Sequence, residues 1–277
     1  MRSYAFSTLP CSNWSVEQLV ETCVTLGFTG IELREEAGSL ISLDMDVSEA
    51  VKVARFFHTA SIQITNIGSG ICVKGTEVDH QALNQLKDAA RLASYMNAGG
   101  VRIFLGNFAQ RRDIPLQPID HAGIVHWLQQ ACTIAEAYGT EVWVETHNEY
   151  AVGSMLRKLL EDVNHPACKV IYDIIHPLED GEHPAQTIKL LGDRCAHIHI
   201  KDGVPPQDPL QHDWIYTKVG EGSLPIGEIV QTLEQEGYRG FYSLEWETKW
   251  RKELQQLAIE PEIIFHHYID FMNKISR

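Results

Sequence analysis

Four short apolar segments of the chain each end on a residue that can bind a metal ion. These terminal residues are Glu145, Asp173, His199 and Glu245. Three carboxylates and one imidazole suit a divalent cation such as Mn²⁺, Mg²⁺ or Co²⁺, whereas structural zinc sites prefer Cys and His. The pattern predicts one divalent metal ion, with Zn²⁺ as a further possibility, provided that the four segments converge on one point.

Eight strand-like apolar segments alternate with amphipathic segments, which predicts how the ligands could converge. We expect strands at residues 4–8, 30–34, 62–67, 101–105, 142–145, 170–173, 197–200 and 242–245. We expect helices near residues 15–26, 47–59, 81–96, 119–138, 154–163, 184–191, 226–236 and 261–272. This alternation predicts a (β/α)8 TIM barrel formed by a single domain, residues 1–277, in which all strand C-termini face one mouth.

An open doubly wound sheet has the same alternation and is the alternative fold. Such a sheet usually carries a glycine-rich turn after its first strand. Here the turn reads Leu9-Pro10-Cys11-Ser12-Asn13-Trp14 and has no glycine. The barrel is therefore the better prediction.

The composition of the chain limits which partners and which cellular compartment we expect. The net charge of −14 would repel a phosphate backbone, so we expect no nucleic-acid partner. The six cysteines form no Cys-x-x-Cys pair, which is typical of free thiols in a reducing compartment. No apolar run is long enough to cross a membrane, and the first residues show no secretory signal. We therefore expect a cytoplasmic protein that acts on a small-molecule sugar substrate, and a homo-oligomer is compatible with these features.

The segment around His199 alternates with a period of two, so His197, His199 and Lys201 should share one strand face. His197 is expected to be a hydrogen-bonded core histidine. Lys201 should lie just above the metal, where its ammonium could hold a substrate oxygen. The alternative for Lys201 is a surface position paired with Asp202.

Further candidates for substrate contact lie near other strand ends. His176 follows Asp173 by three residues and could face the same pocket, or it could occupy a turn before Pro177. Glu32 and Arg34 on the second strand could line the mouth, or they could form a structural ion pair.

Three aromatic residues could form an apolar floor for a sugar ring. These are Trp14, Trp246 and Phe108. Aromatic residues near barrel loops are often ordinary packing, so this alternative stays open.

The motifs together resemble the xylose-isomerase-like TIM-barrel superfamily, which contains sugar (phosphate) isomerases and epimerases. The resemblance rests on residues 145–148, 173–177, 197–202, 220–222 and 237–247, and it extends over nearly the whole chain. It implies a single divalent ion held by Glu145, Asp173, His199 and Glu245, with His176 touching the substrate. Endonuclease-IV-like relatives need further histidines after strands three and four, and this chain has residues 66–69 and 104–107 there without histidine.

These observations predict a divalent-metal-dependent isomerase or epimerase of a sugar or sugar derivative. We expect proton abstraction next to a carbonyl through a metal-stabilised enediolate, with Glu145 and Glu245 removing and returning the proton. A metal-dependent lyase or dehydratase acting on a keto sugar by β-elimination is the alternative. A non-catalytic sugar-binding barrel is a third reading. Residues 202–224 are expected to form a lid over the site.

Overall fold

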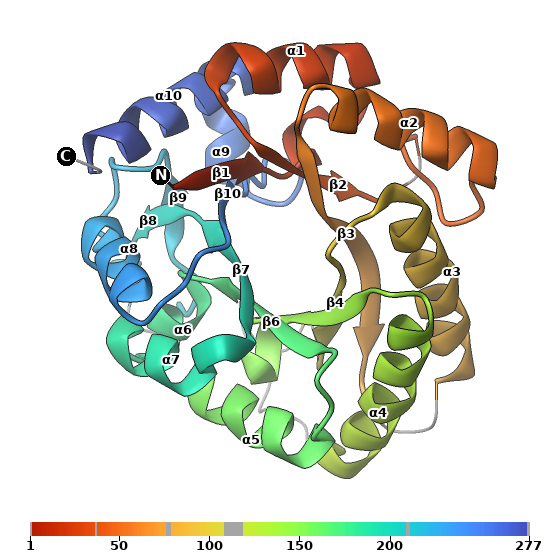
Figure 1. The fold of residues 1–277 in the computed structure, drawn as a ribbon. Coiled ribbons are helices and arrows are strands. Elements are labelled where there is room, and N and C mark those ends of the chain that lie inside the picture. Colours follow the sequence, from red (N-terminus) through yellow and green to blue (C-terminus); the bar gives the residue numbers. More distant parts are fainter. Residues whose placement is uncertain (1, 37, 76–78, 108–118, 209–210, 276–277) are drawn as a thin grey trace.

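Eight parallel strands form a ring in the computed structural model, and helices surround them (Figure 1). The structure describes residues 2–36, 38–75, 79–107, 119–208 and 211–275. The strands of the ring are β1 (Ser3–Phe6), β2 (Gly30–Arg34), β3 (Gln63–Val73), β4 (Gly100–Leu105), β5 (Glu141–Glu145), β6 (Cys168–Asp173), β7 (Cys195–Ile200) and β10 (Phe241–Leu244). Their hydrogen-bonded order is β1-β10-β7-β6-β5-β4-β3-β2.

The seam between β1 and β2 nearly closes this sheet. A parallel bridge joins Ser7 to Glu32, and the Thr8 N–H donates to the Glu32 carbonyl oxygen at 3.0 Å. The predicted (β/α)8 barrel is therefore confirmed. Because all eight strands run in the same direction, their C-terminal ends share one mouth.

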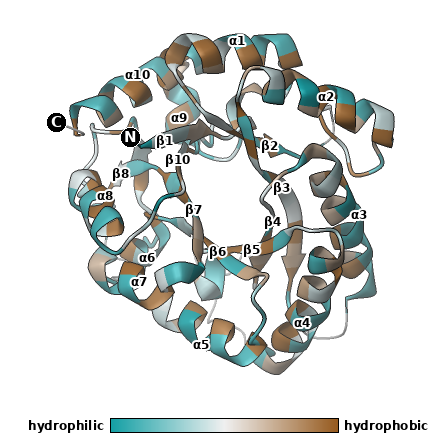
Figure 2. Cartoon of the chain, in the orientation of Figure 1, coloured by the Kyte–Doolittle hydropathy of each residue, from teal (hydrophilic) through white to brown (hydrophobic). Residues whose placement is uncertain are grey.

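Helices cover the outside of the ring. The eight expected helices are present as α1 (Val16–Leu26), α2 (Val47–Thr59), α3 (His80–Met96), α4 (His121–Ala137), α5 (Gly153–Val163), α7 (Pro184–Leu191), α8 (Ile226–Gln235) and α10 (Pro261–Lys274). Polar and apolar residues alternate along them (Figure 2), as expected for helices with one face on a sheet. The short helices α6 (His176–Glu179) and α9 (Lys252–Leu257) were not expected, and neither were the 3₁₀ turns η1 (Leu9–Cys11), η2 (Asn148–Tyr150) and η3 (Gly192–Arg194).

Strand β3 is longer than the sequence predicts, because it continues past Ile67 through a glycine-containing stretch. Its pairing with β4 shifts between Gly68 and Cys72. A Cβ atom on Gly68 would lie 2.8 Å from both Arg34 Cδ and Glu32 Oε1. Glycine is needed at this position because the two side chains of β2 lie against its backbone.

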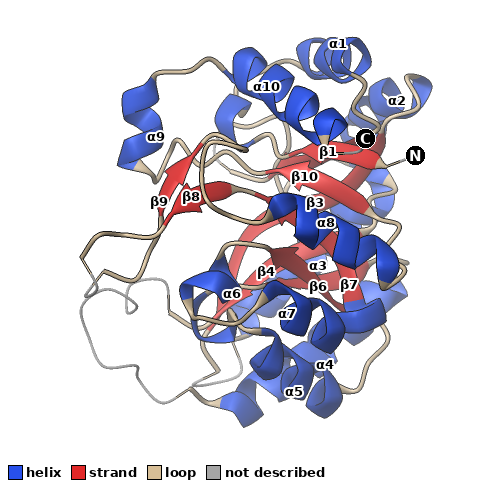
Figure 3. Cartoon of the chain, turned by 90° about the vertical axis from the view of Figure 1, so that its left-hand side faces the viewer, coloured by secondary structure: helices blue, strands red, loops and turns tan. Residues whose placement is uncertain are grey.

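The mouth of the barrel carries a small antiparallel ribbon of β8 (Asp202–Val204) and β9 (Ile215–Thr217), which lies near α9 (Figure 3). The Asp202 carboxylate accepts hydrogen bonds from the backbone N–H groups of Gly203, Gly220, Gly222 and Leu224, at 2.8–3.1 Å. One side chain thus ties the ribbon to the loop that precedes α8. The expected lid segment, residues 202–224, contains this ribbon.

No helix within the described ranges is long and apolar enough to cross a membrane.

An aromatic cluster fastens the last helix to the first strand. Phe265 of α10 stacks on Phe6 at 4.1 Å between ring centroids and meets Phe28 edge-on at 6.2 Å. Phe265 is fully buried, whereas Ile263 on the same helix is 61% exposed. One face of α10 therefore packs against the barrel, and the opposite face is exposed to solvent.

We predict that Phe265→Ala lowers the free energy of unfolding by about 3–5 kcal/mol, because it leaves a cavity among aromatic rings. Ile263→Ala is the matched control and should change it by less than about 0.5 kcal/mol. Urea denaturation of both variants measures the difference. Equal stabilities would show that this cluster does not hold α10 in place.

Candidate metal centre

The four predicted ligands meet at the mouth. Glu145, Asp173 and His199 lie on β5, β6 and β7, and Glu245 follows β10 directly. One ligand atom from each residue lies within 4.8 Å of those of the others, and all four residues are buried. The parallel register brings them together, since Asp173 and Ser243 are both opposite His199.

The two ring nitrogens of His199 have different surroundings. Nε2 donates to Glu32 Oε2 at 2.8 Å. Nδ1 faces Glu245 Oε2 at 3.3 Å and Glu145 Oε1 at 3.6 Å, and no hydrogen bond joins it to the part of the chain that the structure describes. A carboxylate on one nitrogen orients the ring, so the other nitrogen directs its lone pair at the ligands once a metal ion displaces its proton. This arrangement fits a divalent ion bound by His199 Nδ1.

Glu32, His197 and His199 form a second group with suitable spacing. His197 stacks on Trp143, and its Nε2 lies 3.7 Å from Glu32 Oε2. Burial lowers the pKa of His197 to about 3, so the ring is neutral. This group offers a single carboxylate, which already accepts from His199. The oxygen-rich group around Glu145 is therefore the better divalent site.

Lys201 is buried beside the ligands. Its Nζ lies 2.6 Å from Asp173 Oδ2, 2.6 Å from Glu245 Oε2 and 2.5 Å from Glu247 Oε1. The alternative of a surface lysine paired with Asp202 is wrong, because Asp202 is occupied by backbone N–H groups. The ammonium instead stands next to two ligands of the candidate metal.

Arg102 on β4 is a site residue that the sequence reasoning missed. Its Nη1 donates to Glu145 Oε2 at 2.9 Å and lies 3.4 Å from Glu245 Oε1, and Nη2 donates to the Ser69 carbonyl oxygen at 3.0 Å. Its guanidinium also lies over the Phe104 ring at 4.3 Å. The available signal was an arginine in the middle of an otherwise apolar strand.

The buried carboxylates of the site stabilise the protonated forms of Lys201 and His199. Burial lowers the pKa of Lys201 and His199, but the carboxylates around them outweigh this effect and raise both values well above normal. Burial and Glu245 oppose ionisation of Glu145, yet Arg102 and His199 hold its pKa at about 2. The carboxylates around His199 and Lys201 thus create a negative potential, which would also attract a divalent cation.

Asp173 behaves differently in the metal-free protein. Burial raises its pKa to about 7, and Lys201 opposes the shift only in part. A metal ion needs the ionised carboxylate, so it has to compete with a proton at this ligand.

His176 is positioned between the cluster and the ribbon. Its Nε2 lies 3.5 Å from Asp173 Oδ2, and its Nδ1 donates to Glu179 Oε2 at 2.8 Å. Glu179 also accepts from the Trp214 backbone N–H at 2.9 Å, and the His147 ring packs edge-on against His176. His176 is therefore held beside a predicted metal ligand, and its contact with substrate stays a prediction.

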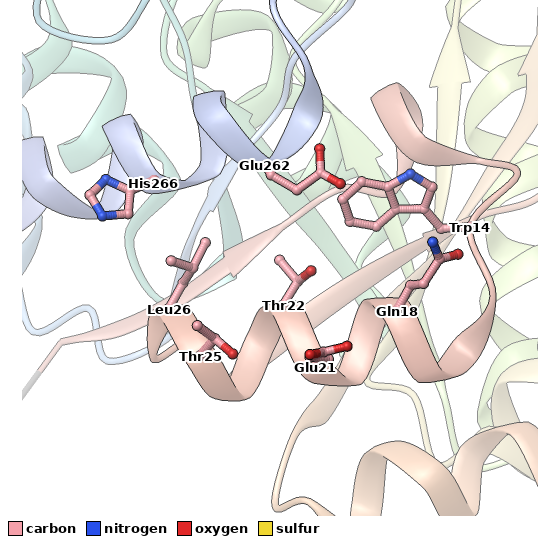
Figure 4. A pocket seen from close by; sticks show the side chains of 8 residues that line it. All are labelled: Trp14, Gln18, Glu21, Thr22, Thr25, Leu26, Glu262 and His266. Carbon is pink, nitrogen blue, oxygen red and sulfur yellow. The ribbon is translucent and has the colours of Figure 1, made fainter.

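The other expected substrate contacts differ in how close they lie to the predicted metal ligands. Glu32 contacts the predicted metal ligands through its hydrogen bond with His199, and Arg34 lies two residues further along β2. Trp14 points elsewhere, because it packs edge-on against Phe265 and lines a pocket of about 410 Å³ between α1 and α10 (Figure 4). Phe108 lies outside the described residues.

Comparison with known proteins identifies the family. The model of the xylose isomerase-like TIM barrel family matches residues 20–265, so the chain belongs to this family. A 3-dehydroshikimate dehydratase from Bacillus anthracis is 23% identical over 247 residues, which cover 84% of this chain and 85% of the relative.

Two further similarities concern an epimerase and a metal-bound structure. A fructoselysine 3-epimerase from Escherichia coli O157:H7 is 23% identical over 252 residues, 86% of this chain and 88% of the relative. The solved structure of the IOLI protein with a binding zinc atom superposes with a TM-score of 0.74 at 18% identity, covering 97% of this chain and 96% of the other.

We predict that protein purified without chelators binds about one divalent ion per chain. His199→Ala should lose it, because the only nitrogen ligand disappears while the fold keeps its strands. Elemental analysis of both proteins measures the content. A fully loaded His199→Ala variant would remove His199 from the ligand set.

Glu32→Gln should weaken the affinity for Mn²⁺ by about 10- to 100-fold without abolishing binding, because Glu32 orients His199 and is not itself a ligand. Competition with a fluorescent chelator gives the affinity, and Glu161→Gln on the surface serves as the control. Complete loss of the ion from Glu32→Gln would favour the alternative group of Glu32, His197 and His199.

Proposed function

We propose that this protein is a divalent-metal-dependent isomerase or epimerase acting on a sugar or sugar derivative by proton transfer next to a carbonyl. The observation that carries the proposal is the placement of Glu145 and Glu245. Both carboxylates are buried, and both lie close to the same nitrogen of His199 and the same nitrogen of Arg102. A divalent ion bound there would polarise a carbonyl and acidify the neighbouring C–H bond.

Glu145 and Glu245 would act as the base and acid of the proton transfer. They come from β5 and from the end of β10, strands separated by β6 and β7 in the ring, so they reach the site from different sides. One carboxylate would take the proton from carbon, and the other would return one to the opposite face, which inverts the centre. Delivery by the same residue to a neighbouring carbon would instead isomerise the sugar.

Lys201 and His176 would stabilise negative charge that develops on the substrate oxygen. Lys201 is a buried cation, and His176 is oriented by Glu179. Preorganised groups of this kind contribute most where water is excluded. The ribbon of β8 and β9 at the mouth supports such exclusion.

Dehydration is a second candidate, favoured by one specific contact. The Lys201 ammonium lies 2.6 Å from Glu245 Oε2, so a proton donor and a base stand side by side. In a β-elimination, the glutamate would take the C–H proton, the C–O bond would break, and the hydroxyl would leave as water with a proton from Lys201. The similarity to a dehydratase supports this alternative.

We predict that turnover of a ketose substrate in D₂O places deuterium on the carbon next to the carbonyl. Glu145→Gln and Glu245→Gln should each lower turnover by at least about 100-fold, because an amide cannot act as a base. Proton NMR of a ketose panel with the Mn²⁺-loaded protein measures both effects.

The product separates the candidates. An isomer retains the mass of the substrate, whereas elimination removes one water. Active enzyme that gives an isomer without any deuterium would instead indicate a hydride shift and would contradict the proton-transfer mechanism.

A further inference from the structure

Arg34 is a buried cation that forms no ion pair with a carboxylate of the described residues. Its side chain lies in the barrel with 7% of its surface exposed, and neither Nε nor Nη1 has a hydrogen-bond partner among the described residues. Its backbone N–H donates to Thr8 Oγ1 at 2.9 Å. An unpaired buried guanidinium is costly, so it calls for a partner that none of the described residues supplies.

The acidic residues near Arg34 in the sequence form no ion pair with it. Glu32 Oε1 lies nearest, beside the Arg34 side chain at Gly68, but no hydrogen bond joins it to any of the described residues. Glu32 accepts from His199 at 2.8 Å, and Glu36 pairs with Lys249 at 2.5 Å. Glu35 directly follows the last residue of β2, so its side chain starts from the face opposite to that of Arg34. Arg34 therefore does not form the structural ion pair that the sequence left open.

Arg34 faces the same interior as the candidate metal centre. Gly68 provides the evidence, because a Cβ placed there would lie 2.8 Å from both Arg34 Cδ and Glu32 Oε1. The two side chains of β2 thus lie side by side, and Glu32 contacts the ligand His199. Arg34 is two residues further along the strand, nearer to the mouth.

The ring order places Arg34 across the mouth from the middle of the ligand set. Three strands separate β2 from β6 in either direction around the ring. Asp173 lies at the end of β6, so a ligand that reaches both Asp173 and Arg34 spans the mouth. The metal would hold one end of it, and Arg34 would meet the other.

We propose that Arg34 binds a carboxylate at the end of the substrate remote from the metal, so that the preferred substrate is an acidic keto or hydroxy compound. This inference rests on the proposed function, since it adds a substrate class to the same site. A guanidinium presents a planar fork that matches a carboxylate with two parallel hydrogen bonds. A phosphate dianion usually recruits several donors or a helix N-terminus, whereas a carboxylate matches one guanidinium.

Three ketoses that differ only at C6 test the proposal. D-fructose carries a hydroxymethyl group, D-fructuronate a carboxylate and D-fructose 6-phosphate a phosphate. Calorimetry on the Mn²⁺-loaded protein should show that D-fructuronate binds at least about tenfold more tightly than D-fructose. Arg34→Gln should abolish this preference, so that D-fructuronate and D-fructose bind with equal affinity. Arg157→Gln, at an exposed arginine on α5, should keep it.

Equal affinity of the wild type for D-fructose and D-fructuronate, including no binding of either, would overturn the proposal. So would a preference that survives in Arg34→Gln. Tightest binding of D-fructose 6-phosphate, dependent on Arg34, would replace the carboxylate by a phosphate and overturn the assignment of substrate class.

Thermal unfolding without any sugar gives an independent check on Arg34. Arg34→Met should melt at a higher temperature than the wild type, because it removes an unpaired buried charge while keeping the aliphatic volume. A lower melting temperature would make Arg34 a structural support and overturn the proposal. Arg34-dependent binding of D-fructuronate without deuterium exchange would uphold the inference and count against the proposed function. Deuterium exchange without Arg34-dependent binding of D-fructuronate would overturn the inference and support the proposed function.

Discussion

Buried negative charge at one end of the barrel is the constraint on which the rest of the site depends. Glu32, Glu145, Asp173, Glu245 and Glu247 all lie at or near strand C-termini, and the first four are fully buried or nearly so. Carboxylates removed from water need cations or strong hydrogen bonds close by. The mouth is therefore organised around positive partners, and a divalent ion would be the strongest of them.

The protein supplies several of these partners itself. Arg102 joins Glu145 to Glu245, and Lys201 joins Asp173 to Glu245. Beyond them, Glu247 pairs with Arg251, whose guanidinium lies over the Tyr216 ring of β9. The charges that hold the candidate metal ligands thus also fasten the ribbon over the mouth. Epimerisation and dehydration both begin with proton abstraction next to a carbonyl, so either reaction could use this arrangement.

Much of this architecture could be predicted from local sequence. Apolar strands that alternate with capped helices are local patterns, and a capping box at Ser15 with a left-handed Gly27 marks both ends of α1 in the structure. The ligands could be found because each ends an apolar strand. Arg102 left only one local signal, an arginine within an apolar strand, and its role was not readable because its partners are 43 and 143 residues away. The aromatic ring of Trp14 turned toward α10, since helix packing decides its direction and no local pattern does.

The central claim is that the metal ion lies among Glu145, Asp173, His199 and Glu245. Anomalous X-ray diffraction from crystals of the Co²⁺-loaded protein, measured at the cobalt absorption edge, tests it most directly. The account predicts one strong peak in contact with His199 Nδ1 and with carboxylate oxygens of the other three residues. A peak on the Nε2 side of His199, bound to Glu32 and His197, would contradict it.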